Sequence, residues 1–228
     1  MKVKTVAYDL FPQKDRVVIL GAGPSYNTNL PAMQEYIQEY KPLVIGSNYN
    51  YPSIASDYTV FIGKSMYSKS HKKIRSPNII ITGHVYKHQE KNVKKDKKHN
   101  YYVVNTRATT KQHSYWNEKK IVFNKSRFQH WLSNSGYTTI LMSAFFRPKE
   151  VCLIGFDGPT IDGSRVHHYN GDTRNNKGNV HSSPTIVARK GRFLELIFDF
   201  LKLHGVERIK AFDNERLWGA KRHSLCTM

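Results

Sequence analysis

A glycine-rich turn follows directly on four apolar residues near the start of this sequence. The apolar run is Val17–Leu20, and the turn reads Gly21-Ala22-Gly23-Pro24-Ser25. In nucleotide-binding α/β domains a buried parallel strand ends at such a turn, because glycine lets the backbone approach a phosphate without a Cβ. Tyr26 stands where the dinucleotide fingerprint would have its third glycine. The turn therefore predicts a nucleotide site without specifying NAD.

Small residues and polar side chains follow other apolar runs. Ser47-Asn48 follows the run at 42–46, and Gly155-Phe156-Asp157-Gly158 follows a later one. Ser135-Gly136 opens a predicted helix, whose unpaired N–H groups attract anions. Ligands of open parallel sheets lie at the carboxyl ends of the strands. We therefore expect these residues to converge with the glycine-rich turn, with Asn48 on a base or ribose and Ser135-Gly136 on a phosphate.

His181 precedes a long predicted helix and is the candidate general base. The reference pKa of histidine, about 6.5, allows proton exchange near neutral pH. His167 and His168 are adjacent in a predicted loop, where adjacent histidines fix no metal geometry. We therefore predict no metal site. The sequence contains neither Gly-x-Ser-x-Gly nor a Gly-Lys-Ser/Thr loop, which argues against a serine hydrolase and a P-loop NTPase.

Alternating strand-like and helix-like segments must position these residues. Apolar runs predict strands at 16–21, 42–46, 57–63, 78–83, 101–104 and 206–212 and a strand-to-loop unit at 150–158. Helical spacing predicts helices at 30–40, 135–146 and 184–203. The alternation favours one Rossmann-like α/β domain over 1–228, with a mostly parallel sheet flanked by helices.

The chain is strongly basic. It has 36 Lys and Arg against 17 Asp and Glu, a formal net charge of +19. Such a charge attracts polyanions, here a nucleic acid, a lipid-linked glycan or an anionic membrane surface. Residues 84–119 are lysine-rich with almost no apolar periodicity, which predicts a mobile basic loop, a lid-like excursion from the domain. A solvated loop without a partner is the alternative.

Cysteine usage and hydropathy bear on the compartment. Cys152 lies in an apolar run and is expected to be a buried thiol, and Cys226 is far from it in the sequence. Two separated cysteines fit a reducing compartment. The sequence has no apolar run of membrane-spanning length and no signal-like segment after Met1. We expect a cytoplasmic protein, peripheral at an anionic membrane surface if it meets one.

Taken in order, these motifs resemble those of the bacterial sialyltransferases of glycosyltransferase family 42. They also resemble the related MptE-like Rossmann-type family, which includes pterin diphosphokinases and flagellin-glycosylation factors. The resemblance implies a metal-independent transferase without a cofactor, whose donor is CMP-sialic acid, whose base is His181 and which forms oligomers. The donor-binding residues that it implies are Gly21, Gly23, Pro24, Ser25, Asn48, Ser135 and Gly136. Their places at strand ends add Ala22, Gly155 and Asp157, and Tyr169 is the candidate for the family's aromatic residue in the following loop.

Three positions depart from the family pattern. Ala22 replaces an asparagine of the family's Gly-Asn-Gly-Pro-Ser loop, Gly63 stands where the family has a nucleotide-contacting asparagine, and Gly158-Pro159 replaces aromatic residues. Ala22 brings no side-chain donor to the phosphate. The departures bear on the identity of the donor more than on the fold.

The leading prediction is a glycosyltransferase that moves a sugar from a nucleotide-sugar donor to an acceptor hydroxyl. One alternative is a diphosphokinase, in which Mg²⁺ would be bound by the substrate phosphates and by Asp157, Asp162 and Asp172. The other is a non-catalytic nucleic-acid-binding module on the same fold. The donor sugar, the acceptor and the oligomeric state are left open.

Overall fold

The computed structural model describes residues 3–5, 10–23, 25–49, 51, 53–106, 123–124, 127–128, 135–156, 184–212 and 226–227. Within these residues, eleven strands form a sheet in the order β11-β10-β9-β2-β3-β4-β5-β6-β8-β7, and β1 pairs with the first half of β6. All neighbouring strands are parallel except β7 and β8. The strands are β1 (Val3–Thr5), β2 (Arg16–Leu20), β3 (Leu43–Ser47), β4 (Tyr58–Phe61), β5 (Asn78–Thr82), β6 (Asn100–Thr106), β7 (Phe123–Asn124), β8 (Arg127–Phe128), β9 (Glu150–Ile154), β10 (Arg208–Ala211) and β11 (Cys226–Thr227).

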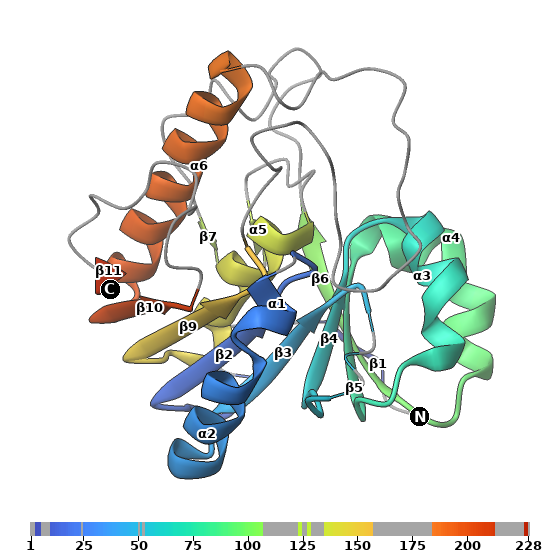
Figure 1. Cartoon of the computed structure of the whole chain (residues 1–228). Coiled ribbons are helices and arrows are strands. Elements are labelled where there is room, and N and C mark those ends of the chain that lie inside the picture. Colours follow the sequence, from blue (N-terminus) through green and yellow to red (C-terminus); the bar gives the residue numbers. More distant parts are fainter. Residues whose placement is uncertain are drawn as a thin grey trace.

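Helices cover both faces of the sheet (Figure 1). On one face, α5 (Ser135–Met142), the 3-10 helix η3 (Ser143–Phe146) and α6 (Pro184–Leu203) enclose the largest apolar core. On the other face, α1 (Ser25–Thr28) and α2 (Leu30–Tyr40) pack on β2, β3 and β9. Next to them α3 (Lys64–Ser70), η1 (His71–Lys73) and α4 (Gly83–Lys95) pack on β4, β5 and β6.

Alternation along the strands decides which side chain enters which core. In β2, Val17 and Ile19 face α5 and α6, whereas Val18 and Leu20 face α1 and α2. All four are fully buried, as expected for a strand covered on both faces. This explains why the run reads as continuously apolar.

The strand order reverses at β2. From β2 the chain builds β3, β4, β5 and β6 outward in one direction, and it then returns to add β9 on the other side of β2 and β10 beyond it. The carboxyl ends of β2 and β9 therefore form a topological switch point. Ligands of open α/β sheets bind in the crevice at such a point.

Local signals in the sequence mark several helix ends. The hydroxyl of Thr82 accepts a hydrogen bond from the N–H of Val85 and caps α4. Pro31 stands in the first turn of α2, where its missing N–H costs nothing. Gly205 follows α6 with a φ of +90°, a left-handed conformation that glycine adopts without strain.

The predicted fold class is confirmed. Helices at 30–40 and 184–203 and every predicted strand are present, and the helix predicted at 135–146 is α5 followed by η3. The basic loop predicted over 84–119 is wrong in its first part, because α4 spans Gly83–Lys95 and β6 spans Asn100–Thr106. Lysines fill the outer positions of α4, and only Val85 and Val93 are buried. The helical apolar periodicity is therefore too weak to be recognised in the sequence. Residues 107–119 lie outside the described residues.

A buried carboxylate joins four elements at the amino edge of the sheet. Glu150, at the start of β9, accepts a hydrogen bond from the hydroxyl of Tyr36 on α2 and pairs with Arg208 of β10. Arg16 of β2 lies 3.6 Å away. Burial alone would raise the pKa of Glu150, but the hydrogen bonds from Tyr36 and Arg208 outweigh it and lower that pKa. Burial also raises the pKa of the neighbouring Cys152 thiol to about 12, which confirms the expectation of a buried thiol.

No helix in the described part of the chain is both long and apolar enough to span a bilayer.

Candidate functional site

Two glycines meet in backbone contact at the switch point. Gly21 follows β2 and Gly155 follows β9. A Cβ placed on Gly21 would lie 2.3 Å from the carbonyl oxygen of Gly155, and a Cβ on Gly155 would lie 2.3 Å from the carbonyl oxygen of Gly21. Gly155 also has a φ of +77°. Both positions therefore require glycine for the close approach of the two turns, a reason separate from contact with any ligand.

Hydrogen bonds connect the same two turns. The N–H of Gly21 donates to the carbonyl of Ile154 at 2.7 Å, and the N–H of Gly23 donates to the carbonyl of Gly155 at 2.8 Å. The N–H of Gly155 in turn donates to the hydroxyl of Ser25 at 3.1 Å. The sequence suggested that the amides of Gly21 and Gly23 bind a phosphate. In the structure they instead donate hydrogen bonds to backbone carbonyls of the protein itself. Ser25 is buried and acts as a structural link between the turns.

Asn48 is the candidate site residue with the most unusual environment. It follows β3, has a φ of +62° and is only 7% exposed. Its N–H donates to the carbonyl of Val60 at 3.0 Å, yet its Oδ1 is buried without a hydrogen-bond partner among the described residues. Leaving a buried polar atom unpaired costs about 1–3 kcal/mol. Such costs, and left-handed backbone at a residue other than glycine, concentrate at functional sites.

Tyr51 joins the strand ends beside Asn48 and was not singled out from the sequence. Its hydroxyl lies 2.8 Å from the carbonyl oxygen of Leu20 and 3.1 Å from that of Ser47, so it bridges the ends of β2 and β3. Its ring packs against Gly46, where a Cβ would come within 3.1 Å of the ring. The ring of Tyr26 packs on the other side at 5.2 Å, and burial raises its pKa to about 12. The only feature of the sequence that could have indicated this role of Tyr51 was the tyrosine-rich segment after β3.

Ser135 and Gly136 open α5, which packs on β3, β4 and α6. Because α5 and η3 lead directly into the amino end of β9, the helix runs against the strands and begins toward their carboxyl ends. The carbonyl of Ser135 accepts a hydrogen bond from the hydroxyl of Thr139 at 2.8 Å. Both residues are half-buried, whereas the rest of the helix is buried. The start of α5 is therefore the part of this helix that remains accessible.

Cationic side chains follow the ends of β4 and β5. Lys64 opens α3, and His84, Lys87 and His88 lie in the first turns of α4. The rings of His84 and His88 are 4.6 Å apart. Partial desolvation, with the charges of Lys64, His84 and Lys87, lowers the pKa of His88. An anion bound at this edge of the sheet would meet a positive environment.

Four predicted site residues lie outside the described residues: Pro24, Asp157, Tyr169 and His181. The same holds for Asp162, Asp172, His167 and His168. Their roles stay predictions. The structure does bring Gly21, Ala22, Gly23, Ser25 and Gly155 together at one edge of the sheet, with Asn48 on the neighbouring strand. Among the described residues, no group of three or more His, Cys, Asp or Glu side chains is arranged to hold a metal ion.

Neither a protein-family model nor a curated protein sequence matches this chain. Among solved structures, the chain is similar to the MAf glycosyltransferase from Magnetospirillum magneticum AMB-1, with a TM-score of 0.54 and 11% sequence identity. The match covers 92% of this chain and 33% of that protein, so this chain spans about a third of its length. The likeness shows that this chain has a fold also found in a glycosyltransferase.

Proposed function

We propose that this chain is a glycosyltransferase that takes a sugar from a nucleotide-sugar donor. The observation that carries the proposal is Asn48, whose unpaired, buried Oδ1 stands at the carboxyl end of β3, one strand from the switch point. A nucleobase amino group or a ribose hydroxyl would donate to this atom and remove the cost of its burial. The fold shared with a MAf glycosyltransferase and the order of the sequence motifs support glycosyl transfer as the chemistry.

In this proposal the donor lies across the ends of β2, β3 and β9. The base and ribose lie at Asn48, and the phosphate lies toward the accessible start of α5 at Ser135 and Gly136. The amides of Gly21 and Gly23 are already bonded to Ile154 and Gly155 and do not supply the phosphate contacts. Their turn instead forms a rigid wall of the site.

The proposed reaction is a single displacement. The acceptor hydroxyl oxygen attacks the anomeric carbon, the bond from that carbon to the nucleotide phosphate oxygen breaks, and its electron pair leaves on the phosphate. His181 takes the proton of the acceptor hydroxyl. Sialic acid is the sugar that the sequence resemblance suggests, and Ala22, where the family has asparagine, is the reason to test other donors as well.

The first test identifies the nucleotide. A ligand that binds only the folded state raises the melting temperature in relation to its affinity. We expect CMP or CMP-sialic acid, screened beside UDP, GDP and ADP with and without Mg²⁺, to stabilise the protein in the presence of EDTA. ATP with Mg²⁺ is included in the screen, and a shift that appears only with this triphosphate would instead support diphosphate transfer. Stabilisation by none of the nucleotides would contradict the proposal.

The second test concerns the base. His181→Ala should keep the donor-induced stabilisation and lower turnover by about 10²–10⁴-fold, the usual contribution of a general base. His71→Ala is the matched control, because His71 lies on η1, which leads into the amino end of β5 and not to the strand ends that carry Gly21, Asn48 and Gly155. Turnover in His181→Ala equal to that of the His71→Ala control would remove His181 from the mechanism and leave the nucleotide site intact.

A further inference from the structure

Within the described residues, the positive charge is concentrated on one part of the surface. Residues 64–98 contain eleven Lys and Arg and two acidic residues, whereas residues 10–41 and residues 194–212 each contain three of either sign. All eleven basic side chains are exposed. We call them the basic face: Lys64, Lys69, Lys72, Lys73, Arg75, Lys87, Lys91, Lys94, Lys95, Lys97 and Lys98.

Packing of the two helices turns these lysines outward. Val85 and Val93 of α4 and Tyr67 of α3 face the sheet and are fully buried. The amide of Gln89 donates to the hydroxyl of Ser68 at 2.9 Å and holds α4 against α3. Figure 1 shows these helices together at the end of the sheet that carries β5 and β6. The basic face is therefore built by two adjacent helices, by η1 and by the short segments that follow η1 and α4, rather than by one long loop.

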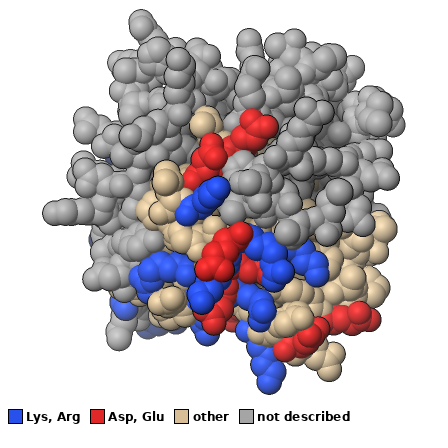
Figure 2. Space-filling model, turned by 90° about the vertical axis from the view of Figure 1, so that its left-hand side faces the viewer, with Lys and Arg blue, Asp and Glu red and all other residues tan. Residues whose placement is uncertain are grey.

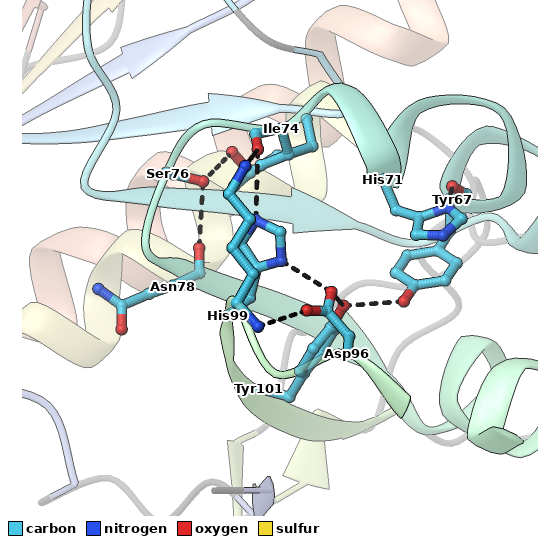
Figure 3. Close-up of polar contacts among 10 residues, drawn as sticks. Tyr67, His71, Ile74, Ser76, Asn78, Asp96, His99 and Tyr101 are labelled. Carbon is cyan, nitrogen blue, oxygen red and sulfur yellow. Dashed lines mark hydrogen bonds and ion pairs between the residues drawn. The ribbon is translucent and has the colours of Figure 1, made fainter. Parts of the chain in front are cut away.

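The two acidic residues of this segment offset little of the positive charge. Glu90 pairs with Lys94 at 2.8 Å, the one ion pair of the basic face within the described residues. Asp96 points inward, toward His99 and Tyr101 (Figure 3). It accepts hydrogen bonds from His99 Nδ1 and the Tyr101 hydroxyl, each at 2.7 Å, and from the N–H of Lys98 at 2.8 Å.

The described surface on the side of α6 and β10 is different. Figure 2 shows the side of the molecule that carries α6 and β10, where basic and acidic side chains are interspersed. On the described surface the positive charge is therefore not spread as a uniform coat that only favours solubility. It forms a directional field centred on α3, η1 and α4.

We propose that the basic face binds the phosphate backbone of a double-stranded nucleic acid. This inference is independent of the proposed glycosyl transfer. Lys87, Lys91 and Lys95 are one helical turn apart and span about 12 Å of the axis of α4. A duplex presents about seven phosphate charges over that length, twice as many as one of its strands. α4 carries four lysines, and α3 and η1, which pack beside it, carry four more, so the three elements together offer about as many charges as the duplex presents.

Other polyanions fit this surface less well. Proteins that bind single strands stack bases on exposed aromatic rings, but the only Tyr, Phe or Trp side chains of α3, η1 and α4 are Tyr67, which is buried, and Tyr86, which is half-buried. Helices that lie in a membrane interface expose large apolar side chains. The exposed large apolar residues of the described chain are Val3, Tyr40 and Leu203, which all lie elsewhere.

Fluorescence anisotropy with a labelled duplex of about 20 base pairs, titrated between about 50 and 300 mM salt, tests the proposal. The test variant is Lys87→Gln/Lys91→Gln/Lys95→Gln, which keeps good helix formers. The matched control, Lys14→Gln/Lys41→Gln/Lys149→Gln, removes the same charge at exposed positions off the basic face. We expect about tenfold weaker binding for the test variant and a log–log salt slope smaller by about 2–3, with the control close to the wild-type protein.

Three outcomes overturn the proposal. They are equal weakening in both triple variants, absence of duplex binding by the wild-type protein at the lowest salt, and tighter binding of phosphatidylserine vesicles or of a single strand than of the duplex. Thermal unfolding of both variants confirms that they are folded, so that a loss of binding is read as a loss of contacts.

Discussion

Gly21 and Gly155 lie so close that neither can carry a Cβ without meeting the carbonyl oxygen of the other at 2.3 Å. Because both contacts are with backbone, no side-chain rotation relieves them. The glycine-rich turn of this fold is thus shaped first by the turn that follows β9. Under the proposed function, its role as a wall of the nucleotide site depends on that packing.

Four glycine-to-alanine variants separate two costs to stability: the contact that an added Cβ makes and the strain of a positive φ. Gly63 has open space around a Cβ and an ordinary φ, Gly205 has open space but a φ of +90°, Gly21 has the contact alone, and Gly155 has both. We expect losses in the free energy of unfolding of under about 0.5 kcal/mol for Gly63→Ala and about 1–2 kcal/mol for Gly205→Ala. Gly21→Ala should cost about 3 kcal/mol or more, and Gly155→Ala the most.

Urea unfolding measures these losses. Gly63→Ala serves as the control, and a Gly21→Ala variant as stable as Gly63→Ala would contradict the close packing of the two turns.

Asn48 offers a test in which stability and binding change separately. Asn48→Gly accommodates the φ of +62° and removes the unpaired Oδ1, so we expect the unliganded protein to keep its stability within about 1 kcal/mol. Asn48→Ala removes the same atom but keeps a Cβ in the left-handed region, so it should be less stable than Asn48→Gly by about 1 kcal/mol. Both variants should bind the nucleotide at least tenfold more weakly by calorimetry. An Asn48→Gly variant with wild-type affinity would exclude contact between this amide and the ligand.

Glu150 predicts the acid limit of stability. Its pKa is lowered in the folded protein, so the carboxylate stabilises the fold above the unfolded pKa of about 4.3, and this contribution is lost as the pH falls through the folded value. We expect Glu150→Gln to cost about 2 kcal/mol at neutral pH, because Tyr36 and Arg208 lose a charged acceptor. The difference from the wild-type protein should shrink below about pH 4.

Urea unfolding at several pH values checks this dependence. Glu35→Gln is the control, since Glu35 is an exposed residue of the same helix as Tyr36. A constant difference between Glu150→Gln and the wild-type protein down to about pH 3 would contradict the lowered pKa.

Asp96 and Tyr101 should be energetically coupled. Tyr101 donates to Asp96 at 2.7 Å, and its oxygen lies 2.9 Å from the hydroxyl of Tyr67, so the three groups form a buried chain. A double-mutant cycle of Asp96→Asn and Tyr101→Phe should give a coupling free energy of about 1–2 kcal/mol. Tyr86→Phe, which removes a longer contact of 3.4 Å to Glu90, should show no coupling to Asp96→Asn. Additive losses for Asp96 and Tyr101 would contradict the chain.

Continuous apolar runs made most of the sheet predictable. Runs such as Asn78–Thr82 are buried on both faces and carry their signal locally. The strands β1, β7, β8 and β11 have only two or three residues, and pairing with a neighbour defines them rather than composition. On α4 only Val85 and Val93 are buried, which is too sparse a pattern for the periodicity to be recognised among the lysines.

The candidate site was predictable in its location but not in its bonding. Strand ends indicated where Gly21, Asn48 and Gly155 converge, because the carboxyl ends of parallel strands meet at one edge. That the amides of Gly21 and Gly23 bond to the turn after β9 depends on a contact between segments 130 residues apart, which no local pattern contains. The same is true of Tyr51, whose hydroxyl joins the ends of β2 and β3.

The strand order also sets a sequence of assembly during synthesis. Each of β3, β4, β5 and β6 pairs with the strand made just before it, so the partners in this half of the sheet are all present before β9 is made. The contact of Gly155 with Ser25 closes a loop of 130 residues and has to wait for β9. The turn after β2 is therefore completed only after β9 has been made, and a chain that ends before Gly155 lacks both the hydrogen bond to Ser25 and the close packing against Gly21.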